Sequence, residues 1–250
     1  MTLQGKHALI TGGGTGIGLA IAQALVTEGV HVTITGRRQD VLEEVAGPGM
    51  TPMAMDVRDE ADVVAKIAGA ADRNGPIQIC IPNAGIAEGK AVHKTTMEFW
   101  RNMMATNLDG AFLTIRESLT SMRQTDWGRV ITIASLAGVR GLKGAACYSA
   151  SKHGMIGLTR SLSEEYIGTP FTFNAVCPGY VATPIVERNI ISIAQRAGIS
   201  EEAALKIMVS SNRHERLIAP EEVAAAVLWL CRPGSQSING QTIEIAGGQV

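Results

Sequence analysis

Tyr148 and Lys152 stand four residues apart in a stretch that reads Tyr-Ser-Ala-Ser-Lys. On a helix this spacing puts two side chains on one face, so both can reach into the same cleft. A phenol has an ordinary pKa of about 10, and a nearby ammonium favours the ionised form and lowers that pKa. A tyrosine tuned in this way can exchange a proton with an alcohol or ketone oxygen. Taken alone, the pair is more simply interpreted as a half-buried aromatic residue and a solvated lysine.

A glycine-rich turn near the N-terminus is the second chemical feature. It reads Gly-Gly-Gly-Thr-Gly-Ile-Gly over residues 12–18, between a predicted strand at 7–11 and a predicted helix that ends at Gly29. Backbone amides at a helix N-terminus bind phosphate, and glycines let a pyrophosphate approach the backbone closely. The spacing is wider than the common dinucleotide pattern, and a tight structural turn is the alternative interpretation.

Strands and helices alternate along the rest of the chain, with short turns between them. Six further strands are predicted at 30–35, 51–55, 77–81, 129–134, 171–177 and 242–245. Helices are predicted at 40–46, 60–73, 97–122, from Tyr148 to about Tyr166, loosely over 184–211, and at 221–231. This alternation predicts an α/β fold with one doubly wound, mostly parallel seven-stranded sheet flanked by helices. No linker or repeat divides the chain.

Composition gives no reason to expect a nucleic acid or an anionic membrane as partner. Charged residues make up only 18% of the 250 residues and the net charge is −1. The four cysteines are scattered and no histidines have metal-ligand spacing, so we expect neither a disulfide framework nor a metal site. No apolar run is long enough for a membrane span, and the N-terminus leaves no room for a signal peptide. A cytoplasmic protein with reduced thiols is expected.

The motifs occur in an order that resembles the short-chain dehydrogenase/reductase family over essentially the whole chain. Ser135 lies 13 residues before Tyr148, as the family pattern requires. Two positions depart from that pattern, with Pro82 in place of a usual asparagine and Ala246 in place of a frequent aspartate. The motifs that match are Thr11 to Gly18, Asp56, Asn83-Ala84-Gly85, Asn107, Ser135, Tyr148, Lys152 and Pro178-Gly179. The resemblance implies a single Rossmann-type domain over residues 1–250.

The resemblance also implies a role for each of four catalytic residues. Tyr148 is expected to be the general acid and base, and Lys152 to lower its pKa and bond the nicotinamide ribose. Ser135 is expected to hold the substrate oxygen. Asn107 is expected to position a water that links Lys152 to solvent. A turn-capping serine and a solvated asparagine are the ordinary alternatives.

A dinucleotide cofactor is the next implication, with no metal. Asp56 is expected at the adenine, Asn83 to Gly85 at the adenosine ribose, and Pro178 to Thr183 at the nicotinamide. The second strand ends in two arginines and no acid, which favours NADP and leaves NAD as an alternative. The expected cofactor-binding residues are Gly12, Thr15, Gly16, Ile17, Gly18, Arg37, Arg38, Asp56, Val57, Asn83, Ala84, Gly85, Tyr148, Lys152, Pro178, Gly179, Val181 and Thr183.

Residues 184–216 are longer than a simple connection requires, and we expect them to form a lid over the substrate. The stretches 177–186 and 198–202 resemble 3-oxoacyl thioester and polyketide reductases and 3-hydroxybutyrate dehydrogenases. The expected function is therefore NADP-dependent reduction of a ketone, with a 3-oxoacyl thioester as the substrate. The alternatives are NAD-dependent oxidation of a 3-hydroxy acid or another secondary alcohol, and a redox-sensing binding protein.

Arg140 and Lys143 could meet an anionic carrier or a carboxylate, although ordinary surface charges are the simpler interpretation. The family resemblance further implies a homotetramer, formed through the helix at 97–122, the Tyr148 helix and the C-terminal strand region.

Overall fold

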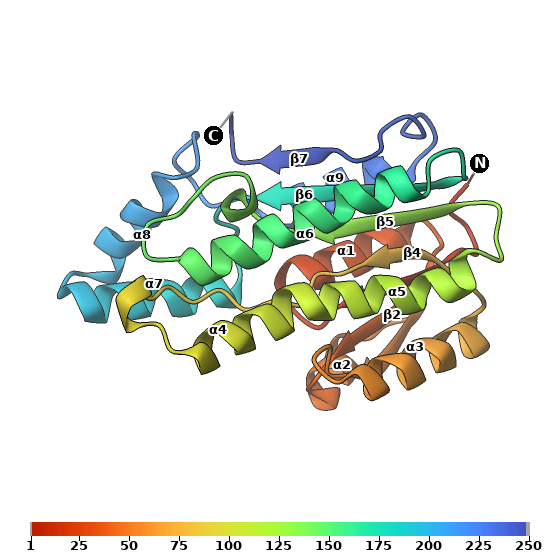
Figure 1. The fold of residues 1–250 in the computed structure, drawn as a ribbon, viewed down its shortest axis with the longest axis horizontal. Coiled ribbons are helices and arrows are strands. Elements are labelled where there is room, and N and C mark those ends of the chain that lie inside the picture. The colour runs from red at the N-terminus through yellow and green to blue at the C-terminus, as the bar shows by residue number, and fades with distance from the viewer. Residues whose placement is uncertain (1, 249–250) are drawn as a thin grey trace.

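The computed structural model describes residues 2–248 and contains one seven-stranded sheet in which all strands run parallel (Figure 1). The strand order is β3-β2-β1-β4-β5-β6-β7. The predicted fold class is confirmed. The strands are β1 (His7–Thr11), β2 (His31–Gly36), β3 (Met50–Ala54), β4 (Ile77–Ile81), β5 (Gly128–Ile133), β6 (Phe171–Pro178) and β7 (Thr242–Ile245).

Helices cover both faces of the sheet and explain why its central strands are buried. The helices α1 and α9 pack together on one face, and α3, α5 and α6 cover the other (Figure 1). Strands β1, β5 and β6 are buried along their whole length, as expected for parallel strands between two helical layers. The helices are α1 (Gly16–Thr27), α2 (Gln39–Val45), α3 (Glu60–Asn74), α4 (Met97–Met104), α5 (Gly110–Met122), α6 (Ala146–Glu165), α7 (Pro184–Ala197), α8 (Glu201–Val209) and α9 (Pro220–Cys231).

The direction of winding reverses between β1 and β4. The chain first builds outward from β1 to β3 and then returns to place β4 on the other side of β1. In open α/β sheets, ligands bind at such a switch point, beyond the carboxyl ends of the strands. The glycine turn follows β1 and Asn83 follows β4, so the topology brings both predicted motifs to this edge.

Two predicted helical regions differ in detail from the structure. The single helix expected over 97–122 is interrupted by a π-helical segment, η2 (Ala105–Asp109), between α4 and α5. The loose region expected over 184–211 is two regular helices, because Thr183 and Ser200 cap α7 and α8 and Gly198 ends α7 in a left-handed conformation. None of the described helices is long and apolar enough to cross a membrane.

Candidate active site

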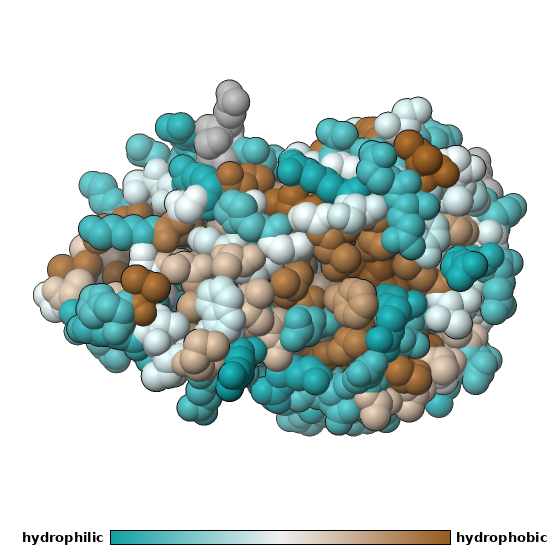
Figure 2. Space-filling view, viewed as in Figure 1, coloured by the Kyte–Doolittle hydropathy of each residue, from teal (hydrophilic) through white to brown (hydrophobic). Residues whose placement is uncertain are grey.

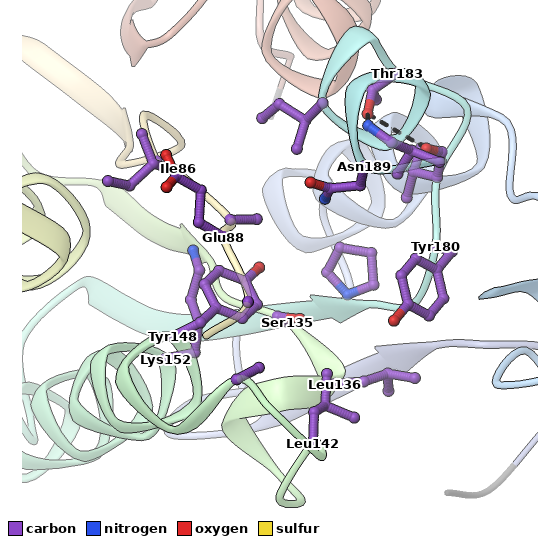
Figure 3. A pocket seen from close by; sticks show the side chains of 18 of the residues that line it. Ile86, Glu88, Ser135, Leu136, Leu142, Tyr148, Lys152, Tyr180, Thr183 and Asn189 are labelled. Atoms are coloured by element: carbon purple, nitrogen blue, oxygen red, sulfur yellow. Dashed lines mark hydrogen bonds between the residues drawn. The ribbon is translucent and has the colours of Figure 1, made fainter. Parts of the chain in front are cut away.

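A cavity of about 520 Å³ opens at the carboxyl edge of the sheet. Residues that directly follow β1, β4 and β5 line it, together with the end of β6 and the helix α7. Figure 3 shows Tyr148 and Lys152 side by side on α6, with Ser135 next to them and Tyr180 and Asn189 on the opposite wall. The structure therefore brings three of the four predicted catalytic residues into one cavity.

The Tyr148 hydroxyl lies in an environment that favours its protonated form. Burial raises the pKa of Tyr148, and a hydrogen bond with Ser135 offsets part of that increase. Ser135 caps the short 3-10 helix η3 (Leu136–Gly138), where its Oγ accepts a hydrogen bond from the amide of Ala137 at 3.1 Å. Its own hydroxyl proton is thus available to a second acceptor. Burial has a larger effect on the pKa of Tyr148 than any neighbouring group, and the lowering by Lys152 that the sequence predicts remains a prediction.

Lys152 is a buried cation held by the main chain. Only 4% of the residue is exposed, and its Nζ donates a hydrogen bond to the carbonyl of Ile133 at 2.8 Å. Desolvation lowers the pKa of Lys152 to about 8, and no carboxylate among residues 2–248 forms an ion pair with it. The Nζ atom lies 5.8 Å from the centre of the Tyr148 ring. A charge kept buried without a counter-ion is typical of a functional site.

Asn107 is completely buried in the π-helical segment, and four hydrogen bonds fix its side chain, one of them from Nδ2 to Met103 Sδ at 3.2 Å. Its Oδ1 accepts from the amide of Ile86 at 2.8 Å, and its Nδ2 donates to the Ile86 carbonyl and to Ser151 Oγ, each at 3.0 Å. Asn107 therefore joins the helix to the segment after β4 and to α6. Its hydrogen bonds do not include Lys152, so the expected proton relay remains a prediction.

The glycine turn has the shape that a pyrophosphate requires. Gly12 and Gly16 have φ angles of +66° and +54°, and a Cβ atom on Gly18 would lie 2.4 Å from the Gly12 carbonyl oxygen. Thr15 precedes α1 without capping it, and the first turn of that helix carries no acidic side chain. The helix N-terminus thus remains available to an anion. Gly12, Thr15, Gly16 and Ile17 line the cavity, whereas Gly18 packs the helix against the turn.

Asn83 connects the ends of β1 and β4. Its Nδ2 donates to the carbonyls of Thr11 at 2.9 Å and Gly12 at 3.2 Å, and Thr11 Oγ1 accepts from the amides of Asn83 and Ala84. Asn83, Ala84 and Gly85 all line the cavity. Pro82 lacks an amide proton, but its carbonyl still accepts a hydrogen bond from the amide of Ile133 at 3.0 Å. The proline therefore does not disrupt the pairing of β5 here.

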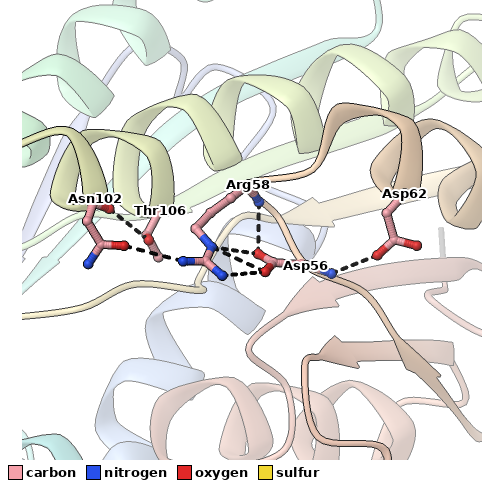
Figure 4. A network of polar contacts seen from close by, with 5 residues as sticks. All are labelled: Asp56, Arg58, Asp62, Asn102 and Thr106. Atoms are coloured by element: carbon pink, nitrogen blue, oxygen red, sulfur yellow. Dashed lines mark hydrogen bonds and ion pairs between the residues drawn. The ribbon is translucent and has the colours of Figure 1, made fainter. Parts of the chain in front are cut away.

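Besides Gly18, four predicted cofactor residues lie outside the cavity. Arg37 and Arg38 are exposed at the end of β2, and Val57 is buried against Gly110. Asp56 forms an ion pair of 2.6 Å with Arg58, whose guanidinium also donates to Asn102, as Figure 4 shows. The same arginine lowers the pKa of Asp56. The carboxylate of Asp56 thus already has a partner in this structure.

The segment after β6 lines the cavity beside the glycine turn. Pro178, Gly179, Val181 and Thr183 line the cavity as predicted. Thr183 Oγ1 accepts from the amide of Val186 at 3.4 Å and so caps α7, while its methyl group packs against Gly16. Gly179 is required by packing, because a Cβ atom there would lie 2.2 Å from Asn212 Oδ1.

Several cavity residues escaped the sequence-based prediction. Tyr180 lines the cavity directly after the predicted Pro-Gly pair, and Asn189 extends from α7 into it (Figure 3). The loop 86–91 forms a further wall, and Arg196 Nη1 donates to the Gly89 carbonyl at 3.3 Å. The position of Tyr180 next to Gly179 was the one local signal; the loop carries no motif.

Comparisons with known proteins agree with this arrangement. A family model described as short chain dehydrogenase matches residues 6–192. A Streptomyces virginiae protein named as a ketoacyl reductase of the monensin polyketide synthase is 39% identical, over 97% of this chain and 96% of that protein. The D-beta-hydroxybutyrate dehydrogenase of Rhizobium meliloti is 34% identical, over 97% of this chain and 98% of that protein.

A solved structure shares the fold along nearly the whole chain. It is a variant of actinorhodin polyketide ketoreductase with NADPH, and it superposes with a TM-score of 0.93 at 34% identity, over 97% of this chain and 96% of that one. The chain therefore belongs to the short-chain dehydrogenase family and is an NAD(P)-dependent oxidoreductase.

Proposed function

We propose that this protein reduces the ketone of a 3-oxoacyl substrate to a secondary alcohol, with NADP as cofactor. The observation that carries the proposal is the convergence of Ser135, Tyr148 and Lys152 in a cavity that also contains the glycine turn. Bound NADPH would supply the hydride. The protein must then hold the ketone and deliver a proton to its oxygen.

The side chains in the cavity are suited to these two tasks. Ser135 can donate its hydroxyl proton to the ketone oxygen, because its Oγ already accepts from Ala137. Tyr148 is the proton donor, and its raised pKa keeps the phenol protonated until the oxygen becomes negative. Lys152 carries its charge beside the ring and favours the phenolate that remains after the transfer.

The glycine turn and Arg37 support NADP as the cofactor. The uncapped start of α1 suits the pyrophosphate. The packing around Gly12, Gly16 and Gly18 has no room for a Cβ atom, and without side chains there the pyrophosphate can approach the backbone closely. Arg37 and Arg38 are exposed at the end of β2, where an arginine accommodates the 2′-phosphate of NADP. The similar solved structure, actinorhodin polyketide ketoreductase, is a structure with NADPH.

The relative named as a ketoacyl reductase supports a 3-oxoacyl substrate. The second candidate is NAD-dependent oxidation of a 3-hydroxy acid, which the similarity to D-beta-hydroxybutyrate dehydrogenase favours. In both cases we propose that residues 184–216 cover the substrate, since Ile185, Ile193 and Met208 from this segment line the cavity. The four free, buried cysteines support a cytoplasmic location.

The test is a binding titration with NADPH and with NADH, followed by turnover of acetoacetyl-CoA. We expect tighter binding of NADPH and its oxidation when the thioester is added. Tyr148→Phe should lower kcat by about 10²- to 10⁴-fold and leave NADPH binding nearly unchanged. Preference for NADH together with oxidation of 3-hydroxybutyrate would favour the second candidate, and full activity of the variant would contradict both.

A further inference from the structure

The cavity carries a strong positive charge that the chain as a whole does not have. Glu88 is the single acidic residue among the described residues that line it, and the five cationic ones are Lys90, Arg140, Lys143, Lys152 and Arg196. The net charge of the chain is −1. A cavity lined by one sign of charge focuses the field and attracts ligands of opposite sign. The substrate side of this site is thus suited to an anion.

Arg140 is the cation whose surroundings point to a ligand. Its Nε is buried and has no hydrogen-bond partner in the described part of the chain, and its Nη2 makes a long contact of 3.4 Å with the Ser211 carbonyl. No carboxylate of residues 2–248 forms an ion pair with it. A guanidinium has five N–H donors, and buried donors are normally satisfied. The Nη atoms of Arg140, which lines the cavity, therefore keep donor capacity for a bound molecule, while its Nε has no partner within the described part of the protein.

The position of Arg140 is tied to that of Ser135. The amide of Arg140 donates to the Leu136 carbonyl at 3.0 Å, so the turn that begins at Ser135 also holds the arginine. Tyr180 also lines the cavity. Burial raises the pKa of Tyr180, and the positive charge of Arg140 partly offsets that increase. Arg140 is therefore not an ordinary surface charge, whereas Lys143, on the same loop, is exposed.

We propose that Arg140 binds an anionic group of the substrate, a carboxylate or a phosphate, while the ketone lies against Ser135 and Tyr148. The proposal rests on the function proposed above and narrows its substrate class to anionic 3-oxo compounds. A planar guanidinium can bind either group through two parallel hydrogen bonds. Because one turn holds both residues, this contact would also set which substrate lengths place the ketone correctly.

Steady-state kinetics of NADPH oxidation with four ketones test this role. Acetoacetate carries a carboxylate, acetoacetyl-CoA carries phosphates, and methyl acetoacetate and S-acetoacetyl-N-acetylcysteamine are neutral. Arg140→Gln should raise KM for the anionic substrate about tenfold to a hundredfold with little change in kcat, and leave the neutral substrates unaffected. Arg140→Lys should restore part of the loss. The control is Arg123→Gln, which removes an exposed arginine outside the cavity.

The four ketones separate the two sources of the negative charge. A loss confined to acetoacetate assigns a carboxylate, and a loss with acetoacetyl-CoA but not with its cysteamine analogue assigns a phosphate. Equal KM values for wild type and Arg140→Gln with every ketone, or equal losses on charged and neutral ones, would overturn the proposal. Thermal melting of each variant shows whether a loss comes from unfolding.

A second measurement separates failure of this proposal from failure of the proposed function. If none of the four ketones is reduced with either nucleotide, the proposed function is wrong. Calorimetric titration of acetoacetate and of acetoacetyl-CoA, without nucleotide, then tests Arg140 directly. Binding that Arg140→Gln weakens about tenfold or more supports the anion site. Equal binding to both proteins, or none to either, contradicts it.

Discussion

At the scale of single residues, the site depends on an ionisable side chain kept in an unfavourable environment. Lys152 is buried without a carboxylate, so the folded protein carries the cost of desolvating an ammonium. A solvated lysine would not lie beside the Tyr148 ring with its Nζ fixed by the Ile133 carbonyl. The burial thus gives the site a cation of fixed position at the expense of stability.

Lys152→Met should make the protein more stable at neutral pH. The pKa of Lys152 falls from 10.5 to about 8 on folding, and a shift of this size corresponds to about 3 kcal/mol of lost stability. The variant recovers this free energy but loses the hydrogen bond to the Ile133 carbonyl, which reduces the gain. We expect a gain of about 1–3 kcal/mol in the free energy of unfolding at pH 7. Urea unfolding of both proteins measures the difference.

The same comparison has a pH dependence of known sign. Below about pH 8 both states of the wild type hold the lysine proton, so the cost is full. Between about pH 8 and 10.5 the folded state releases the proton and the unfolded state keeps it, so wild-type stability rises relative to the variant. A difference that stays constant from pH 7 to pH 10 would contradict the lowered pKa.

Arg37→Glu tests the choice of cofactor. A carboxylate at the end of β2 repels the 2′-phosphate and can accept a hydrogen bond from the ribose of NAD. The Kd for NADPH should therefore rise by about tenfold or more, with a much smaller change for NADH. Fluorescence titration of both nucleotides gives the ratio, with Arg123→Glu as the charge-matched control. An unchanged ratio would mean that Arg37 does not contact the phosphate.

At the scale of elements, the turn after β6 determines the position of the cavity wall that faces Tyr148 and Lys152. Asn212 Oδ1 accepts from the Tyr180 amide and its Nδ2 donates to the Tyr180 carbonyl, each at 3.0 Å. Asn212 follows α8, so one side chain joins the segment 184–216 to the end of β6. Gly179 permits this approach because it has no Cβ atom.

Gly179→Ala should disturb that junction. The new Cβ would overlap Asn212 Oδ1, and relief of such overlap typically costs about 1–3 kcal/mol of unfolding free energy. The matched control is Gly69→Ala in α3, where the added Cβ meets open space and should stabilise the helix by about 0.5–1 kcal/mol. Thermal unfolding distinguishes the two, and equal melting temperatures for both variants would exclude the close packing at Gly179.

At the scale of the whole molecule, the face formed by α5 and α6 exposes apolar surface. Phe112 is 45% exposed on α5, and Figure 2 shows apolar side chains gathered over the middle of this face. Apolar patches of this kind mark interaction surfaces in soluble proteins. We propose that the chain forms a homotetramer in which this face meets a second copy.

Phe112→Glu should therefore shift the protein to a smaller oligomer. The glutamate would place a charge in the proposed apolar interface, which is costly unless the charge is paired. Light scattering after gel filtration measures the mass, with Val64→Glu on α3 as the control for an equally exposed apolar residue. A wild-type protein that is monomeric, or a variant of unchanged mass, would contradict this interface.

The sequence by itself determined the fold class and which motifs meet at one edge of the sheet. Strand and helix signals are local, so the order of elements predicts a doubly wound sheet, and that topology places the carboxyl ends of β1, β4, β5 and β6 at one edge. Gly12, Ser135 and Tyr148 could therefore be assigned to one site although they lie far apart along the chain. The π-helical turn at Asn107 could not be predicted, because the hydrogen bonds that Asn107 makes with Ile86 and Ser151 join segments far apart in the sequence.

Only the tertiary structure decided the electrostatics of the site. The pKa of Tyr148 and that of Lys152 depend on burial, which the Tyr-x-x-x-Lys spacing does not specify. Desolvation is the largest effect on each group, raising the pKa of Tyr148 and lowering that of Lys152. Arg140 was indistinguishable from a surface charge until Ser211 and Tyr180, some 40 to 70 positions further along the chain, enclosed it. Sequence spacing specifies which side chains share a helix face, but the packing of distant segments determines how deeply each charged group is buried and therefore how far its pKa shifts.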